Sequence, residues 1–167
     1  MRLLGIDPGH SGALAFLDLD AATLSVVTMP TVTLSNGKTY VDEGALANLV
    51  GSLAPSIAFI EDVYSSPQMG VVSAFSFGEG KGVLKGVLAG LGVERRYVSP
   101  AKWKADLGTS SDKDHTKALA RKLFPKCRAI LRSEGKCEAA LIGLWGALSI
   151  REVTLSFTPA ANVNASK

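Results

Sequence analysis

The chain begins MRLLGIDPGHSGALAF (1–16), and the position of Asp7 in this stretch decides how the fold is interpreted. The apolar run at 3–6 predicts a buried strand, because strands covered on both faces show nearly continuous apolar residues. Asp7 ends that strand, and Pro8-Gly9 follows at once as a turn signal. A carboxylate at the end of a buried strand is costly unless something compensates its charge. The rest of the sequence therefore has to supply partners for Asp7.

The bulk composition describes an ordinary soluble domain. At 167 residues the chain is long enough for one domain with a sizeable core, which we expect over 1–153, with a loosely ordered tail at 154–167. Apolar residues make up 47% and charged residues 20%, and no apolar run reaches the ~18 residues of a membrane span. Cys127 and Cys137 lack metal-ligand spacing, and no secretory signal is visible, so reduced thiols in a cytoplasmic protein are expected.

The net charge of +3 conceals a strong asymmetry along the chain. Residues 1–94 carry 4 Lys and Arg against 9 Asp and Glu, whereas residues 95–136 carry 12 against 4. A basic segment beside an acidic half indicates either a polyanion partner such as nucleic acid or a solvated helix face. Charge alone does not separate these two interpretations.

Hydrophobic periodicity and turn signals predict a mixed α/β fold. Short turns join the first three strands, so they should run antiparallel. Asp42 and Ser99 are plausible N-caps of the helices that follow them. The predicted strands lie at 2–7, 12–19, 24–29, 56–63 and 95–98, and the predicted helices begin near 42 and cover 71–91, 100–105, 112–123 and 137–151. The resulting fold class is a five-stranded mixed sheet with three antiparallel N-terminal strands and flanking helices.

Several acidic residues occur where a sheet edge could collect them. Asp7 and Glu61 end or nearly end two strands, whereas Asp62 should point to the opposite face. Glu134 and Glu138 are spaced i, i+4, so they project from one side of a helix. Any one of these acids is more simply explained as a surface carboxylate. Together they predict a site for Mg²⁺, whose preferred ligands are oxygens and which supports phosphoryl chemistry.

Four segments of the sequence carry recognisable motifs in a fixed order. The first is GIDPG with SGA after it, from Gly5 to Ala13. The others are IEDVYSSPQMG followed by FSFGEGKGVLKGVL (60–88), SPAKWK followed by SSDKDHTKALARKLFP (99–125), and EGKCEAALIGLWG (134–146). Together they resemble the RuvC-type Holliday junction resolvases of the RNase H-like superfamily, specifically their phage and prophage branch. The resemblance covers roughly residues 1–150.

The resemblance implies a role for each of the matching residues. Asp7, Glu61 and Glu138 would be catalytic metal ligands, with Glu134 as a fourth, and Lys113 would act at the scissile phosphate. It also implies two Mg²⁺ ions per site, with Mn²⁺ as a substitute, a four-way DNA junction as substrate, and a homodimer formed through the helix at 71–91. The residues expected to bind DNA are Lys102, Lys104, Lys113, Lys117, Arg121 and Lys122.

The closing motif departs from the family pattern, which often has an Asp four or five residues before the last acid. Ser133 and Glu134 occupy those positions here, so the site has either three acids or four. Three alternatives therefore stay open: a flap or branched-DNA nuclease, a recombinase core, and a junction-binding protein without catalysis.

Phe75 and Phe77 are assigned to core packing in preference to base stacking. The glycines at 78–82 lack the GxxxxGK[ST] pattern, so no nucleotide cofactor is expected.

Overall fold

A mixed sheet forms the centre of the molecule in a computed structural model that describes residues 1–150 and 156–161. Within these residues the sheet has six strands in the order β7-β6-β1-β2-β3-β8. The first three strands are antiparallel, β6 and β7 run parallel to β1, and β8 runs parallel to β3. The strands are β1 (Arg2–Asp7), β2 (Ala13–Asp18), β3 (Thr23–Thr28), β6 (Ile57–Glu61), β7 (Glu94–Val98) and β8 (Thr158–Pro159). A separate hairpin pairs β4 (Thr31–Thr33) with β5 (Thr39–Val41).

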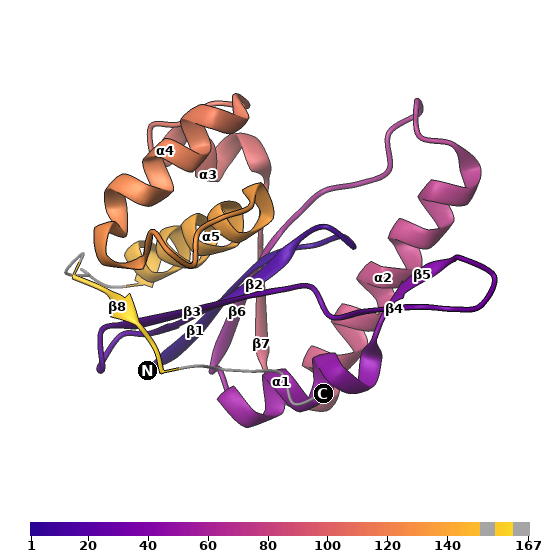
Figure 1. The fold of residues 1–167 in the computed structure, drawn as a ribbon, viewed down its shortest axis with the longest axis horizontal. Coiled ribbons are helices and arrows are strands. Elements are labelled where there is room, and N and C mark those ends of the chain that lie inside the picture. The colour runs from indigo at the N-terminus through magenta and orange to yellow at the C-terminus, as the bar shows by residue number, and fades with distance from the viewer. Residues whose placement is uncertain (151–155, 162–167) are drawn as a thin grey trace.

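Helices cover both faces of this sheet, as Figure 1 shows. One face carries α3, α4 and α5, and the other carries α1 and α2. Their bounds are α1 (Glu43–Leu53), α2 (Val71–Gly90), α3 (Pro100–Asp106), α4 (Lys113–Leu123) and α5 (Glu134–Ile150), with a 3-10 turn at Pro125–Cys127. The expected caps form, because Asp42 accepts from the Ala45 amide and Ser99 accepts from the Lys102 amide.

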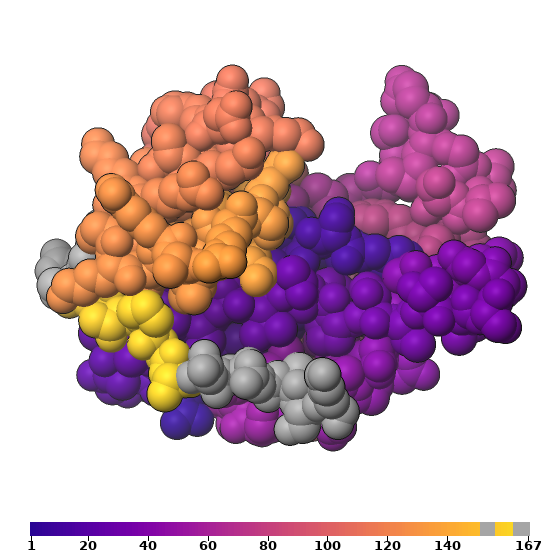
Figure 2. All heavy atoms as spheres, viewed as in Figure 1, coloured from indigo at the N-terminus to yellow at the C-terminus, as the bar shows by residue number. Residues whose placement is uncertain are grey.

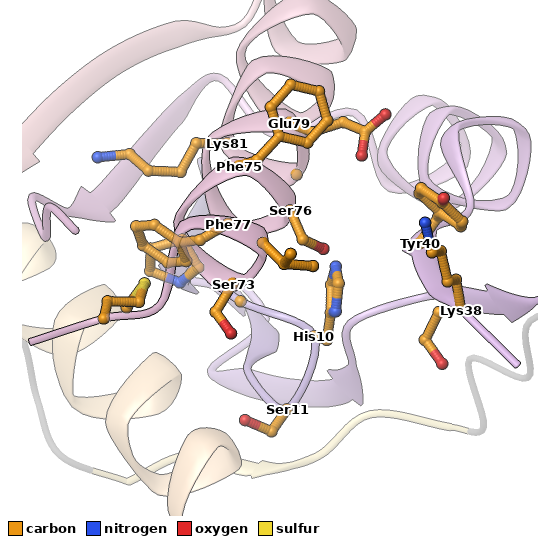
Figure 3. A pocket seen from close by; sticks show the side chains of 16 residues that line it. His10, Ser11, Lys38, Tyr40, Ser73, Phe75, Ser76, Phe77, Glu79 and Lys81 are labelled. Carbon is orange, nitrogen blue, oxygen red and sulfur yellow. The ribbon is translucent and has the colours of Figure 1, made fainter.

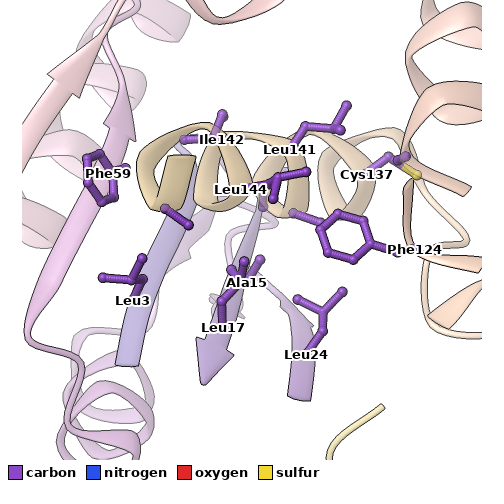
Figure 4. Close-up of a cluster of buried hydrophobic side chains, with 14 of the residues drawn as sticks. Leu3, Ala15, Leu17, Leu24, Phe59, Phe124, Cys137, Leu141, Ile142 and Leu144 are labelled. Atoms are coloured by element: carbon purple, nitrogen blue, oxygen red, sulfur yellow. The ribbon is translucent and has the colours of Figure 1, made fainter. Parts of the chain in front are cut away.

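The sheet is buried on both sides, which explains the continuous apolar run in β1. Leu3 belongs to the core beneath α5, whereas Leu4 and Ile6 belong to the core beneath α1 and α2. Figure 4 shows the first of these cores, with the sheet side chains facing Leu144 of α5. The α5 backbone lies directly on β1 at Gly5, where a Cβ atom would be 2.2 Å from the Ala139 carbonyl oxygen. This close approach fixes how the second and third turns of α5 lie against β1.

The mixed α/β class with antiparallel N-terminal strands is confirmed, but the two short strands of the hairpin, β4 and β5, and the sixth strand of the central sheet were not predicted. The sixth strand, β8, comes from the segment expected to be a loose tail. Phe157 beside it is 2% exposed and packs on Phe124, with 5.6 Å between the ring centroids. The prediction of a loose tail is therefore wrong for residues 156–161. The predicted boundary at 153 and the rest of the tail fall on 151–155 and 162–167, which lie outside the described residues.

Other differences are small. Helix α5 begins at Glu134 rather than near 137, because Ser133 accepts from the Lys136 amide and starts the helix one turn earlier. Cys127 and Cys137 are buried free thiols. Across the part of the chain that the structure describes, every helix is too short or too polar to cross a membrane.

Figure 2 shows a hollow in the surface between the segment that carries α3 and α4 and the first turns of α2. The indigo N-terminal segment of the chain lies at the bottom of this hollow. The turn after β1 belongs to that segment, and β1 ends at Asp7.

Candidate active site

Asp7 and Glu61 lie at the same edge of the sheet. Strands β1 and β6 are parallel neighbours, and Ile6 is paired with Ile60, so the next residue on each strand reaches the same level. Alternate residues of a strand face opposite sides, which puts both carboxylates on the face covered by α5. Glu61 is only 6% exposed. Two acids from strands far apart in sequence thus meet under one helix.

The first turns of α5 bring two further carboxylates to this edge. Glu134 begins the helix, and Glu138 follows one turn later with a side chain that is 12% exposed. Gly135 lies between them and against Asp7, since a Cβ atom there would be 2.9 Å from the Asp7 Oδ2 atom and 2.7 Å from the Ser11 carbonyl oxygen. A residue without a side chain is therefore what lets α5 start directly over Asp7.

Each of these glutamates has a partner on α3 or α4. Lys104 Nζ lies 2.9 Å from Glu138 Oε1, and Lys113 Nζ lies 3.0 Å from Glu134 Oε2. Trp103 is completely buried, and its indole N–H donates to Glu61 Oε1 over 2.9 Å. The basic segment of the chain thus lies directly over the acidic edge of the sheet, and the hydrogen bond from Trp103 orients the Glu61 carboxylate.

The electrostatics of the cluster show an excess of negative charge. Burial and the nearby charges of Glu138, Glu61 and Glu134 raise the pKa of Asp7 to about 8, although Lys104 acts in the opposite direction. Burial also raises the pKa of Glu61, and the Trp103 hydrogen bond partly offsets that effect. Acids crowded in this way favour their neutral forms unless a cation joins them. Lys104 by itself does not neutralise the cluster.

The donor set fits a hard divalent cation, because all four side chains offer carboxylate oxygens. Within the described residues, however, no three Asp, Glu, His or Cys side chains converge closely enough to hold an ion as they stand. Glu134 and Glu138 are instead held in ion pairs with Lys113 and Lys104.

The lysines and the arginine predicted to bind DNA differ in their exposure to solvent and in their partners within the protein. Lys113 is 72% exposed in its side chain, and Lys122 is exposed, so both reach solvent. Lys102 pairs with Asp106, and Lys117 pairs with Asp114. Arg121 donates to the Leu131 carbonyl and so fixes the loop before α5. Lys104, at 19% exposure, lies inside the acidic cluster rather than on the outer surface.

Other predicted residues differ in their outcome. Asp62 lies near Lys81, at 3.8 Å, and not among the four acids, as the strand alternation indicated. Phe75 is 73% exposed, so its assignment to the core is wrong; α2 buries Leu84 and Leu88 instead.

The role of Trp103 was not identified from the sequence. Its neighbours in the sequence are two lysines, and this local pattern gives no sign that the side chain is buried against Glu61.

Comparisons with known proteins agree with this geometry. Two solved structures of Thermus thermophilus RuvC, one described as a complex with Holliday junction substrate, match with a TM-score of 0.62 at 16% identity. Each match covers 90% of this chain and 95% of the RuvC chain. The fold of this chain is therefore that of RuvC, a mixed α/β fold with antiparallel N-terminal strands.

The sequence comparisons are more limited. A chloroplastic Holliday junction resolvase, MOC1 of Chlamydomonas reinhardtii, is 36% identical over 84 residues, which are 47% of this chain. The match spans 10% of the length of MOC1. No protein-family model matches the chain.

Proposed function

We propose that this chain is a metal-dependent endonuclease that resolves four-way DNA junctions by paired symmetric cuts. The observation that carries the proposal is the meeting of Asp7, Glu61 and Glu138 at one sheet edge beneath a lysine-rich pair of helices. The RuvC fold and the partial match to a junction resolvase support the same conclusion. The reaction is phosphodiester hydrolysis, in which a water oxygen bonds to phosphorus while the bond from phosphorus to one ester oxygen breaks.

The chain's own residues have distinct roles in this reaction. Asp7 and Glu61 would hold the cation from the sheet, and Glu138 from α5, with Glu134 as the fourth carboxylate. Mg²⁺, with Mn²⁺ as a substitute, would stabilise charge on the attacking and leaving oxygens when two ions are bound. Lys113 is free to swing because it is exposed. It would exchange its ion pair with Glu134 for one with the scissile phosphate.

The basic residues around the cluster would position the DNA backbone. Lys102, Lys117, Arg121 and Lys122 lie on or beside α3 and α4, and the hollow in Figure 2 separates these helices from α2. Phosphate contacts fix the register of bound DNA without specifying its sequence. DNA in this hollow would have its backbone near Asp7, so we infer that the hollow is where a branch is held.

Two cuts placed symmetrically on a junction require two active sites, so we infer a homodimer. The face of α2 that is turned away from the sheet supports this inference. Gly78, Gly82 and Gly86 follow one another along that face, and a Cβ atom on any of them would meet nothing within 4 Å. Two copies of α2 could approach closely there. Sedimentation equilibrium should give a dimer for the wild type and a monomer for Gly82→Glu, while a monomeric wild type would contradict this part.

A cleavage assay with labelled substrates tests the function. The protein is incubated with four-way, flap and linear duplex DNA in Mg²⁺, Mn²⁺ or EDTA. We expect symmetric cuts in the four-way junction alone, in either metal and not in EDTA. Preferential cutting of the flap would indicate a branch nuclease or recombinase core with the same fold. Tight junction binding without cuts in either metal would contradict an enzymatic role and indicate a junction-binding protein.

A further inference from the structure

Lys81 lies in the middle of α2 and has no part in the proposed active site or in the proposed DNA contacts. It borders a groove of about 670 Å³ between α2 and the β4–β5 hairpin. In Figure 3, however, its ammonium group points away from Lys38 and Tyr40 of the hairpin. The side chain is only 11% exposed. A lysine in this position needs partners within the protein, because an unpaired buried ammonium group is costly.

The partners of Lys81 come from the segment that directly follows β6. Its ammonium group donates to the Val63 carbonyl and lies 3.8 Å from Asp62 Oδ1. The same group lies 4.6 Å from the centre of the Tyr64 ring, which is within the range of a cation–π contact. The Tyr64 hydroxyl in turn donates to Asp62 Oδ2 over 2.9 Å. Three consecutive residues are thus held by one lysine of α2.

These three residues continue directly from Glu61, one of the proposed metal ligands. The Asp62 amide donates to the Val98 carbonyl over 2.8 Å, so the chain stays on β7 for one residue beyond the end of β6. Successive residues of an extended chain face opposite sides of the sheet, so Glu61 faces α5 and Asp62 faces α2. Trp103 holds the Glu61 carboxylate on the first face, and Lys81 holds the chain on the second. The end of β6 is therefore held from both sides.

Past Asp62 the chain leaves the sheet. Residues 62–70 form neither a helix nor a strand. Tyr64 is 75% exposed, so packing gives the start of this segment little support. The contacts with Lys81 therefore supply a constraint that the sheet no longer provides.

We propose that Lys81 is a positioning residue for Glu61, which it holds in place for the cation through the segment from Asp62 to Tyr64. The proposal rests on the proposed function and extends it to the opposite face of the sheet. In this role Lys81 contacts neither the cation nor the DNA. It also gives Asp62 a function other than metal binding, because Asp62 is part of the anchor that Lys81 holds.

The substitution Lys81→Met tests the proposal, because it removes the ammonium group and keeps an unbranched side chain. Titration of the free protein with Mg²⁺, followed by the rise in melting temperature, measures metal affinity without DNA or cleavage. We expect Lys81→Met to bind Mg²⁺ about tenfold more weakly, as partners that orient metal ligands affect affinity by 10–100-fold. Removal of a positive charge would by itself strengthen the binding of a cation. A loss of affinity therefore reports the position of Glu61 and not the charge of Lys81.

Cleavage of the four-way junction provides a second readout. In Lys81→Met, the Mg²⁺ concentration at half-maximal rate should rise about tenfold, while the rate at saturating Mg²⁺ stays near that of the wild type. Junction affinity in EDTA should not change. Lys81→Arg keeps a cation beside the Val63 carbonyl and should restore most of the Mg²⁺ affinity.

Lys85→Met is the matched control. Lys85 lies about one turn further along α2, is exposed, and has its ammonium group 5.6 Å from the Tyr97 ring centre. It loses the same charge and should bind Mg²⁺ as the wild type does. Tyr64→Ala changes an exposed position, so it should fold, and loss of the cation–π contact should weaken Mg²⁺ binding by up to about fivefold.

Wild-type Mg²⁺ affinity in Lys81→Met would overturn the proposal, and so would equal losses in Lys81→Met and Lys85→Met. If Lys81→Met does not fold, wild-type affinity in Tyr64→Ala would overturn it instead. These results would leave the proposed function intact, because the wild type would still cut junctions. A wild-type protein that neither bound Mg²⁺ nor cut junctions would overturn both.

Discussion

The two faces of the central sheet carry their helices in different ways. On one face the backbone of α5 lies directly on β1, with Gly5 and Gly143 at the crossing, and its first turn reaches Asp7 through Gly135. On the other face α2 buries only Leu84 and Leu88, while its first residues extend beyond the sheet. The face beneath α5 carries the four carboxylates, and Lys104 and Lys113 hold the two that come from the helix in ion pairs. The other face leaves a groove and an uncovered helix surface, so the proposed catalytic acids all lie on the face where a helix packs directly on the sheet.

The largest effect on cleavage is expected from a substitution of Asp7, at the sheet edge beneath α5. Asp7→Asn removes a charged ligand without changing side-chain volume, and loss of even an outer partner of a metal site costs 10–100-fold. We therefore expect junction cleavage to fall by at least about 100-fold, with binding in EDTA unchanged. Rates from single-turnover assays and affinities from gel shifts measure the two quantities. Unchanged cleavage would remove Asp7 from the site.

A smaller effect on stability and cleavage is expected from a substitution of Gly135, the residue that lets α5 start over Asp7. The methyl group of Gly135→Ala would contact the Asp7 carboxylate and the Ser11 carbonyl, so the first turn of α5 has to shift. Overpacking of this kind costs about 1–3 kcal/mol of stability, and cleavage should fall as Glu138 moves. Gly44→Ala, at an exposed position of α1 with no atom closer than 3.6 Å to the new Cβ, is the matched control. Equal behaviour of the two variants would show that the close crossing does not position the acids.

The two tryptophans allow a comparison between a buried and an exposed hydrogen bond from an indole N–H to a carboxylate. Trp103 donates to buried Glu61, whereas Trp145 donates to Asp106 at the surface over 2.7 Å. Trp103→Phe removes the hydrogen bond that orients Glu61, so metal affinity and cleavage should each fall about 10–100-fold. The Mg²⁺-dependent rise in melting temperature reports metal binding independently of cleavage. Trp145→Phe should leave that rise unchanged, and an equal loss in both variants would indicate a general effect on packing.

The positions of the acids at the sheet edge could be predicted from the sequence, whereas the packing of the helices on the sheet could not. Asp7 and Glu61 end apolar strands, and strand alternation is local, so their placement follows from the pattern of neighbouring residues. The hydrogen bond from Trp103 to Glu61 joins positions 42 residues apart, and no local pattern encodes it. Strand β8 is similar, because two residues carry no periodicity and Phe157 is buried by packing on Phe124. The groove was missed because it forms only when the hairpin folds against α2.

A pH dependence of stability is expected in the metal-free protein. Because burial and neighbouring acids raise the pKa of Asp7 to about 8 from 3.8, the folded state favours its protonated form. This contribution is complete at low pH and is lost as the pH rises from about 4 toward 8. Asp7→Asn should therefore match the wild type near pH 4 and melt at a higher temperature near pH 8. A constant difference between pH 4 and 8 would contradict the raised pKa.

The position of a bound cation tests the central claim most directly. Crystals of the wild-type protein soaked in Mn²⁺ should give anomalous density bounded by the carboxylates of Asp7, Glu61 and Glu138. Glu138 should then have left Lys104, and contact between Glu134 and the ion would settle whether three acids or four form the site. Density at another place, or saturating Mn²⁺ with both glutamates still paired to their lysines, would contradict the account.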